Sequence, residues 1–384
     1  MHHFHRRMLG RVVTPIAIMA LASWSAVIPL HGEPQGKRKT TARQDVVEAG
    51  ATDSPEPVSP VVQLIRDPHV QDELKLTRRQ AVTLEAAYAK IEQPLWLARD
   101  YTSGPRAAEK AQLASAFATS LAPLLEPAQR ARLRQLELQA RGWPALKTAA
   151  VAGELDLTLD QMRRIGEVLE QTQQQMQKAA SSSQPASERE QTITRLRTEQ
   201  GTAIQNILSR KQTEALAGMV GESYDLSRIR PLTFTAPELK QVDDWINSQP
   251  LTNVDLQGKV VAFHFWAFGC INCVHNLPHY NKWQDQFSAK GLLILGMHTP
   301  ETAAERNVDT LRKNIGDRGI RYAVAVDHEG ANWAAWANSM WPSVYLVDKR
   351  GKVRYWWYGE LNWQGSDGEK FIREKIQELL AEKK

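Results

Sequence analysis

The sequence predicts an α+β multidomain protein: an all-α duplicated helical domain followed by a domain whose central mixed β-sheet is flanked by helices. Three observations predict this class. Residues 61–226 are rich in Ala, Leu, Gln, Glu and Arg and place apolar residues at helical spacing. The same residues contain an internal repeat at an offset of 81. Residues 227–384 hold nine of the twelve tryptophans and alternate strand-like runs with helical ones.

Residues 1–32 have the form of a signal peptide or an N-terminal anchor. The basic start MHHFHRR precedes the apolar stretch 12–30, and no acidic residue occurs before Glu33. This pattern is typical of an export signal, and the sequence leaves its cleavage open. We therefore expect a periplasmic or otherwise extracytoplasmic protein, which contacts a membrane only through this segment if the segment stays uncleaved.

Residues 33–60 carry four prolines, mixed charge and no aromatic residue, a composition that predicts a disordered linker. The whole chain has 48 Lys and Arg against 43 Asp and Glu, and three of the basic residues belong to the N-terminal segment. The near balance that remains gives no reason to expect a nucleic-acid partner.

The repeat in residues 61–226 joins VQDELKLTRRQ, which begins at Val70, to VAGELDLTLDQ, which begins at Val151. Six of these eleven positions are identical. A weaker pair, LEPAQ from Leu125 and LSRKQ from Leu208, follows at an offset of 83. Self-similarity at a fixed period predicts a duplicated helical unit of about 80 residues.

The T-x-x-Q element of each copy is typical of a capping box at a helix start. We expect Thr77 and Thr158 to accept hydrogen bonds from the first turn, and Gln80 and Gln161 to reach back to the cap's own N–H group. The element also resembles the LTxxQ motif of small periplasmic helical proteins related to the Spy and CpxP stress proteins. That resemblance implies binding of unfolded chains or sensor proteins. An alternative function is therefore a client-binding, chaperone-like protein with an accessory redox-sensing domain.

The C-terminal region begins with a strand–helix–strand pattern and continues into a hairpin around Lys349, Arg350 and Gly351. This order predicts a mixed sheet between helices. The expected strands are 260–266, 292–298, 321–326, 344–347 and 353–357, and the expected helices are 270–287, 303–315 and 367–380.

The chain has two cysteines, Cys270 and Cys273, in the stretch FWAFGCINCVHNLP at the start of an expected helix. A helix N-terminus offers free N–H groups and a partial positive charge, which stabilise a thiolate. The strand-then-helix context therefore favours a redox dithiol, in which Cys270 attacks and the more buried Cys273 releases the mixed disulfide.

Other uses of the cysteine pair are less favoured. His275 and His279 extend the pattern to C-x2-C-x-H-x3-H, a potential zinc or copper ligand set, but four ligands on one short helix start cannot easily surround an ion. We expect no metal and no cofactor. A structural disulfide would close only a very small loop. A peroxiredoxin-type antioxidant activity needs a threonine shortly before the reactive cysteine, and none of the three residues before Cys270 is one.

FWAFGCINC resembles the F-W-A-x-x-C-x-x-C signature of thioredoxin-like proteins. The supporting stretches, in order, are WINSQPLTNVDLQGKVV, GMHTPE, YAVAVDHEGANWAAW, MWPSVYLVDKRGKV and YGE. The resemblance runs from about Trp245 to the C-terminus and is closest to extracytoplasmic members of the TlpA, ResA and DipZ type. It implies a thioredoxin fold for residues 227–384 and a redox-active disulfide, Cys270–Cys273, that exchanges with protein substrates carrying cysteines or disulfides.

The resemblance also implies roles for residues around the disulfide. Pro342 would be a cis-proline facing the cysteines, Trp341 would pair with a substrate backbone, and Trp266 would lie beside the site. His264 stands where many thioredoxins carry a buried acid, so it either relays a proton from Cys273 or is a core histidine. DipZ-type proteins carry a membrane electron-transfer domain, so a separate membrane electron donor is an expected partner here. The direction of electron flow stays open.

Overall fold

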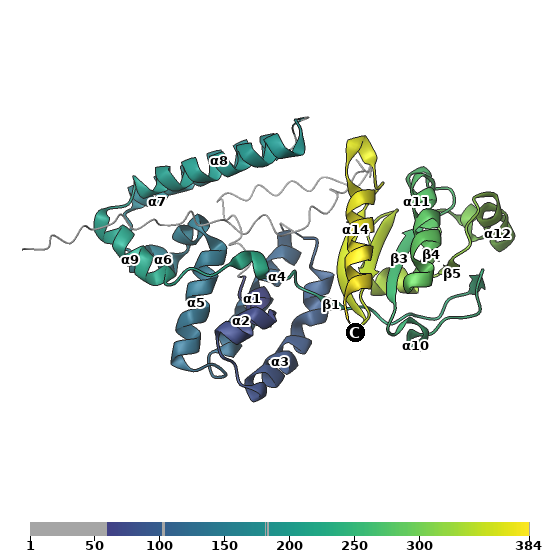
Figure 1. Ribbon diagram of the computed structural model, residues 1–384, viewed down its shortest axis with the longest axis horizontal. Helices are drawn as coiled ribbons and strands as arrows, with labels where there is room; N and C mark the ends of the chain where they lie inside the picture. Colours follow the sequence, from purple (N-terminus) through teal and green to yellow (C-terminus); the bar gives the residue numbers. More distant parts are fainter. Residues whose placement is uncertain (1–59, 102–103, 181, 183, 384) are drawn as a thin grey trace, which may run out of the picture. The chain divides into compact units, whose positions relative to one another are not determined.

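A computed structural model describes residues 60–101, 104–180, 182 and 184–383 (Figure 1). The expected N-terminal signal or anchor, and the linker up to residue 59, lie outside the described residues. Among the described residues, contacts define two compact units: residues 127–226, and residues 60–126 together with 227–383. The predicted helical domain is thus divided between the two units, which differs from the boundaries expected from the sequence.

The first repeat copy contributes helices to the unit that also holds the sheet. These helices are α1 (Val61–Arg66), α2 (Pro68–Glu73), α3 (Arg78–Leu97) and α4 (Gly104–Leu121). Thr77 and Gln80 form the predicted capping box at the start of α3. The Gln80 side chain also donates to the Leu124 carbonyl at 2.8 Å, so it joins the start of α3 to the end of the α3–α4 hairpin.

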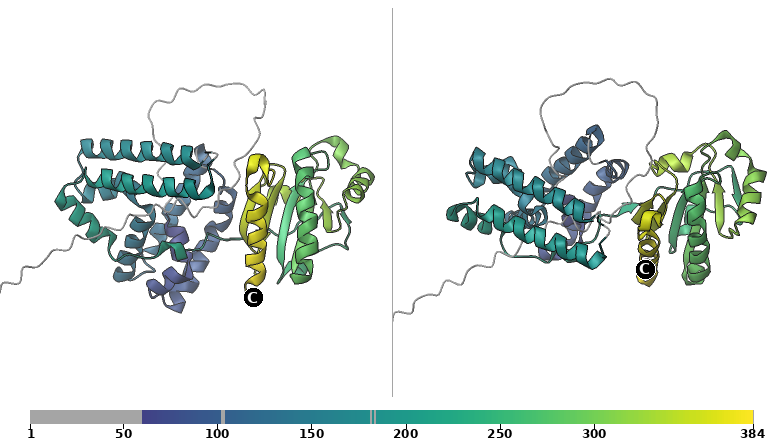
Figure 2. Two further views of the ribbon diagram at one scale, coloured as in Figure 1. Left: turned by 45° about the horizontal axis from the view of Figure 1, so that its top comes forward. Right: turned by 90° about the horizontal axis from the view of Figure 1, so that it is seen from above.

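The other compact unit contains only helices. They are α5 (Pro127–Arg141), the 3-10 helix η2 (Trp143–Lys147), α6 (Ala149–Glu154), α7 (Leu159–Ala180), α8 (Ala186–Gln205) and α9 (Arg210–Val220). Helices α7 and α8 run side by side as a long hairpin (Figure 2). The core of this helical unit contains the buried residues Trp143, Ile165, Ile204 and Leu216.

The two repeat copies share local conformation as well as sequence. Helices α2 and α6 have equal length at an offset of 81 residues, and each ends in a turn with one left-handed residue, Lys75 (φ 53°) or Asp156 (φ 49°). The second capping box is present too, because the Gln161 N–H donates to Thr158 Oγ1 at 3.2 Å and the Thr158 N–H donates to Gln161 Oε1 at 3.0 Å. The predicted capping role of both T-x-x-Q elements is therefore confirmed.

The C-terminal region folds around a seven-stranded mixed sheet with the order β1-β7-β6-β3-β4-β5-β2. Strands β3–β4 and β4–β5 pair in parallel, and the other neighbours pair antiparallel. The strands are β1 (Phe234–Thr235), β2 (Asp244–Ile246), β3 (Val260–Trp266), β4 (Leu292–His298), β5 (Ala323–Val326), β6 (Ser343–Val347) and β7 (Lys352–Tyr358). The predicted central mixed sheet is confirmed, with β3 and β4 at their predicted bounds.

Helices α10 to α13 lie between strands in the sequence, and α14 follows the last strand. One expected helix, 303–315, is interrupted, because Asn307 adopts an extended conformation and its side chain accepts from the Thr310 N–H at 2.7 Å to start a new helix. The elements are η3 (Leu226–Arg228), α10 (Asn253–Leu256), α11 (Ile271–Phe287), η4 (Ser288–Lys290), η5 (Ala303–Arg306), α12 (Val308–Asp317), α13 (Ala331–Ala335), η6 (Trp363–Gly365) and α14 (Gly368–Ala381).

The two faces of the sheet are covered differently. Successive strand residues point to opposite faces. On one face, Trp266 packs in a buried cluster with Leu277 and Trp283 of α11 and Ile376 of α14, the two helices that lie along the sheet in Figure 1. The opposite face is covered by an aromatic cluster, whose members are Phe263, Phe265, Tyr345, Trp356, Trp336 after α13 and Trp96 of α3.

Trp96 is therefore a core residue of the sheet although it belongs to a helix of the repeat. It is 3% exposed, and its ring centroid lies 5.3 Å from that of Phe234 and 5.9 Å from those of Tyr345 and Trp356. The Arg99 guanidinium lies 3.8 Å over the Trp96 ring and donates to the Tyr345 hydroxyl at 3.1 Å.

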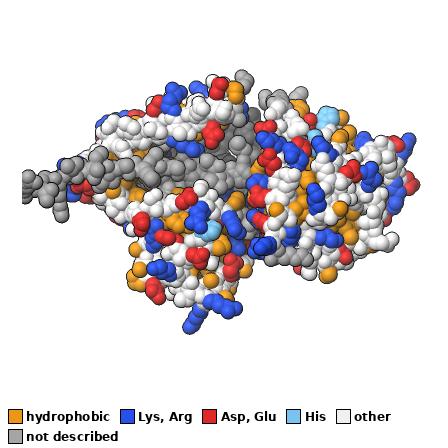
Figure 3. Space-filling model, viewed as in Figure 1, with side chains coloured by type: hydrophobic (Ala, Val, Ile, Leu, Met, Phe, Trp, Pro, Cys, Tyr) orange, Lys and Arg blue, Asp and Glu red, His pale blue; other side chains and the backbone are white. Residues whose placement is uncertain are grey.

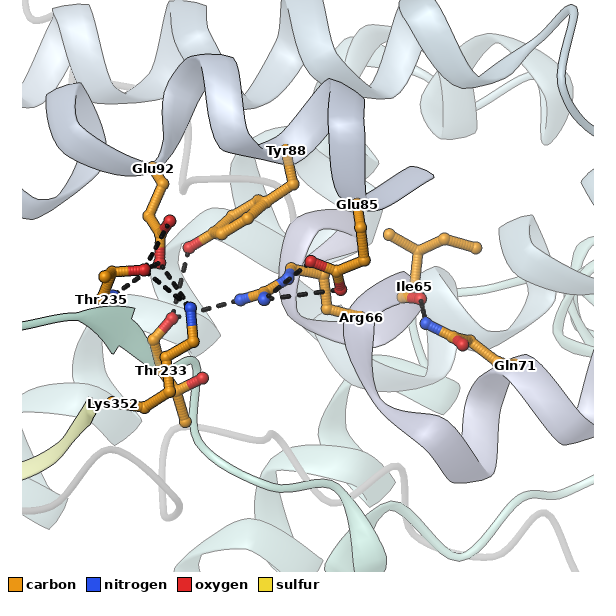
Figure 4. Close-up of polar contacts among 9 residues, drawn as sticks. All are labelled: Ile65, Arg66, Gln71, Glu85, Tyr88, Glu92, Thr233, Thr235 and Lys352. Atoms are coloured by element: carbon orange, nitrogen blue, oxygen red, sulfur yellow. Dashed lines mark hydrogen bonds and ion pairs between the residues drawn. The ribbon is translucent and has the colours of Figure 1, made fainter. Parts of the chain in front are cut away.

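Polar contacts connect α1 and α3 to the segment around β1 (Figure 4). The Arg66 guanidinium lies 3.6 Å over the Tyr88 ring and donates to the Thr233 carbonyl at 3.1 Å. Glu92 accepts from the Thr235 N–H at 2.6 Å and from its hydroxyl at 3.0 Å. The first helices of the repeat and the C-terminal sheet thus share both apolar and polar contacts.

Acidic and basic side chains of the described residues are interspersed over the face drawn in Figure 3. In the part of the chain that the structure covers, none of the helices combines the length and the hydrophobicity that a membrane span requires.

Candidate active site

The two cysteines lie at the junction between β3 and α11. Cys270 is the N-cap of α11, and its sulfur accepts the Cys273 N–H at 3.3 Å. The two sulfurs form a disulfide, with Cα atoms 5.2 Å apart. Cys270 is half-buried, whereas Cys273 is 1% exposed. An incoming thiol or disulfide can therefore reach Cys270 more readily than Cys273.

The local sequence explains this placement. Strand β3 is a run of buried residues, which suits a central strand covered on both faces. The chain then turns through Ala267 to Gly269, and the Cys270 N–H donates to the Ala267 carbonyl at 3.3 Å. The Val274 N–H donates to the Cys270 carbonyl at 3.1 Å, which is the first bond of α11. At this helix start the Cys273 N–H points at the Cys270 sulfur.

Trp341 and Pro342 precede β6, and their peptide bond is cis as predicted. Trp341 is half-buried and packs, like Cys270, against the cluster that contains Cys273 and Trp266. The Trp341 indole donates to the Thr299 carbonyl at 3.0 Å, and its ring lies 4.1 Å from that of Trp333. Both predicted tryptophans therefore belong to, or pack against, the cluster that also contains Cys273.

His264 lies in the middle of β3 and is fully buried. Its ring stacks on Tyr280 of α11 at 4.1 Å and lies 5.3 Å from Tyr322. Burial lowers its pKa to about 3, so the ring is neutral at ordinary pH. Neither ring nitrogen has a hydrogen-bond partner among the described residues. Its closest aromatic contact is thus with Tyr280, two helical turns beyond Cys273.

The sequence reasoning missed Glu305 and His298, which lie beside the site. Glu305 is 3% exposed and accepts the Gly269 N–H at 2.8 Å. His298 is buried at the end of β4, stacks on Phe268 at 5.5 Å, and has its pKa lowered to about 4 by burial. The capping pattern T-x-x-E of Thr302 and Glu305 was a visible signal, but it indicates only a local helix start.

The two histidines after the cysteines make other contacts. His275 Nδ1 lies 2.9 Å from a Glu360 oxygen, and His279 Nε2 lies 3.4 Å from the Asn362 amide. Among the residues that the structure describes, no group of three or more His, Cys, Asp and Glu side chains gathers as a metal ligand set.

The mixed sheet, the C-x-x-C disulfide at a helix start and the cis-proline before β6 define a thioredoxin-like domain. Comparison with known proteins identifies it further: residues 233–356 match the AhpC/TSA family. The C-terminal part of this chain is therefore a thioredoxin-like domain that is similar to that family.

Individual relatives each match between 33% and 38% of the chain. Protein DipZ of Mycobacterium tuberculosis is 40% identical over 129 residues, which is 33% of this chain and 19% of DipZ. Thiol-disulfide oxidoreductase YkuV of Bacillus subtilis is 24% identical over 146 residues, covering 38% of this chain and 94% of YkuV. A solved thiol-disulfide isomerase from Corynebacterium glutamicum is 26% identical over 38% of this chain and 98% of its own, with a TM-score of 0.34. The match to DipZ spans about a fifth of that protein.

Proposed function

We propose that this protein is an extracytoplasmic thiol–disulfide oxidoreductase that exchanges disulfides with protein substrates through Cys270 and Cys273. The observation that supports it best is the asymmetry of the pair. Cys270 is accessible and caps a helix start, where a thiolate is stabilised, while Cys273 is buried one turn further on. The names of YkuV and of the ResA relative from Bacillus thuringiensis are consistent with this activity.

In the reducing direction the chemistry takes two steps. The Cys270 thiolate attacks one sulfur of a substrate disulfide, forms a mixed disulfide and releases the other substrate sulfur as a thiolate, which takes up a proton. Cys273 then loses its proton and attacks the Cys270 sulfur, which releases the second substrate thiol and leaves the Cys270–Cys273 disulfide. Two electrons and two protons pass from the dithiol to the substrate. The oxidising direction is the reverse.

The neighbouring residues have supporting roles in this proposal. Trp341 offers its backbone to the substrate chain beside Pro342, and its ring, held by Thr299 and Trp333, forms one wall of the substrate groove. Trp266 packs beneath the cysteines. Of the two roles expected for His264, that of a core histidine fits better, because burial lowers its pKa to about 3 and makes its ring a weak acceptor for the proton of Cys273.

The location and the partners belong to the same proposal. The basic and apolar N-terminal sequence supports export, and exported thioredoxin-like domains act on protein thiols and disulfides outside the cytoplasm. A separate membrane electron donor would return the disulfide to the dithiol after each reductive cycle.

The proposal is tested by insulin disulfide reduction with the full chain, comparing wild type with Cys270→Ser and Cys273→Ser. We expect Cys270→Ser to lose activity, and Cys273→Ser to accumulate a mixed disulfide that dithiothreitol releases. If Cys270→Ser reduces insulin as fast as wild type, the proposal is wrong. If Cys270→Ser no longer reduces insulin but suppresses the aggregation of an unfolded client as well as wild type does, the client-binding alternative is favoured. A redox titration with glutathione determines the direction of electron transfer. A reduction potential of about −270 mV indicates a reductant, and one of about −120 mV indicates an oxidant.

A further inference from the structure

We propose that Glu305 is a positioning residue for Cys270, whose carboxylate holds the peptide group in front of the attacking cysteine and makes its thiol a weaker acid. The inference rests on the proposed function for its biological meaning. Its physical basis is a set of contacts around one buried side chain.

The Glu305 carboxylate joins two loops that are far apart in the sequence. Its Oε1 accepts the Gly269 N–H at 2.8 Å. Its Oε2 accepts the N–H groups of Glu301 and Thr302, both at 2.8 Å, and the Thr302 hydroxyl at 3.2 Å. One side chain thus links the turn before α11 to the loop that follows β4.

The contacts of the Glu305 carboxylate suit a group that only accepts hydrogen bonds. Each described partner of Glu305 is an N–H or O–H group that donates, whereas a protonated carboxyl would carry a donor of its own. A buried charge is costly unless hydrogen bonds satisfy it, and these four bonds do so. The Glu305 carboxylate therefore lies beside the active-site turn with all its described partners donating to it.

A second capping box in the same domain provides an internal comparison. Thr252 and Asp255 form the equivalent pattern at the start of α10, and the Asp255 carboxylate accepts from the Thr252 N–H and hydroxyl, both at 2.7 Å. That residue lies on the surface. Helix capping alone does not require burial, so the burial of Glu305 and its bond to Gly269 call for another explanation.

The bond to Gly269 fixes the Phe268–Gly269 peptide group, which is the second peptide group before Cys270. That peptide group consists of the Phe268 carbonyl and the Gly269 N–H. Arg318 donates to the Phe268 carbonyl at a long 3.5 Å, while Glu305 accepts from the Gly269 N–H at 2.8 Å. The peptide is therefore held from both ends, and the Phe268 ring is stacked on His298. Because Gly269 precedes Cys270, these contacts hold the backbone of the turn from which Cys270 follows.

Gly269 allows this close approach because it has no side chain. A Cβ atom on Gly269 would lie 2.9 Å from Glu305 Oε1 and 3.4 Å from its carboxyl carbon. Such a contact would displace the tip of the Glu305 side chain from the peptide. Gly269→Ala therefore perturbs the same interaction from the other partner without removing the charge.

The charge of Glu305 opposes the effect of the helix start. The N–H groups of α11 favour the thiolate of Cys270, whereas a carboxylate one peptide group away disfavours it. Arg318 contributes a positive charge on the other side of the turn, and His298 is neutral because burial lowers its pKa to about 4. A single nearby charge shifts a thiol pKa by about one unit.

The test measures the acidity of Cys270 in the full chain. In a Cys273→Ser background, Cys270 is the single thiol, and the pH dependence of its alkylation by iodoacetamide gives its pKa. Adding Glu305→Gln, which keeps the size and one acceptor oxygen, should lower that pKa by about one unit. Gly269→Ala should also lower the pKa of Cys270. Glu301→Gln, which removes an exposed carboxylate from the same loop, should leave it unchanged.

The proposal is overturned if Cys270 has the same pKa in folded Glu305→Gln as in Cys273→Ser alone. It is also overturned if Glu301→Gln shifts the pKa of Cys270 as much as Glu305→Gln does. Circular dichroism establishes folding, and if Glu305→Gln does not fold, Gly269→Ala decides in the same way. The titration needs no substrate, so it gives an answer even if the protein fails to reduce insulin.

Discussion

Replacement of Trp96 by alanine tests whether the repeat contributes to the core of the sheet. Trp96 is 3% exposed, and its indole N–H has no described hydrogen-bond partner, so the substitution removes ring packing and the contact with Arg99 but no hydrogen bond of the side chain. Truncating a buried tryptophan costs about 3–5 kcal/mol. Contacts with four aromatic rings place Trp96→Ala at the upper end of that range.

The assay is urea unfolding of the full chain, followed by near-ultraviolet circular dichroism of the aromatic residues. A loss of about 4 kcal/mol corresponds to a decrease of about 10 °C in the melting temperature of a unit of this size. Trp363→Ala is the matched control, because Trp363 is 38% exposed and its loss should cost about 0.5 kcal/mol or less. A loss below about 1 kcal/mol for Trp96→Ala would refute the packing of α3 on the sheet.

Two further predictions concern pH and capping. Burial lowers the folded-state pKa of His264 to about 3, so the unfolded chain binds a proton below its ordinary pKa of 6.5 while the folded chain does not. The free energy of unfolding should therefore fall as pH decreases from about 6.5 towards 3, by up to about 1.4 kcal/mol per pH unit. In urea titrations, the free energy of unfolding of His264→Phe should depend less on pH than that of wild type. If it depends on pH as strongly as that of the exposed control His275→Gln, the prediction is wrong. Thr158→Ala should lower the stability of the unit 127–226 by about 1 kcal/mol in thermal unfolding. The exposed mid-helix control Thr194→Ala should show no loss, and equal effects would exclude the capping role.

The sequence was most informative where one local pattern decides the structure. Strands β3 and β4 have their predicted bounds because each is an apolar run that a central strand requires. The T-x-x-Q elements start helices because the capping bonds form within three residues. The cysteine pair was also recognisable, since its spacing and its position after a strand carry the chemistry.

Long-range contacts were beyond the reach of these patterns. Trp96 lies in a helix of which only the start resembles its repeat copy, and nothing local indicates that its partners follow more than a hundred residues later. Strands β1 and β2 are two and three residues long, so pairing with β7 and β5 defines them rather than their own composition. Glu305 was missed for the same reason, because its partner Gly269 contributes only a backbone N–H.

The position of Trp96 also bears on how the chain is made. Ribosomes extend a chain at about 5–20 residues per second, and Trp336, Tyr345 and Trp356 follow Trp96 by more than 200 residues. The apolar face of α3 is thus synthesised on the order of 10–50 s before the strands that bury it. Until β7 has emerged, α3 can reach its native environment only in part. Completion of the aromatic cluster therefore awaits the last quarter of translation.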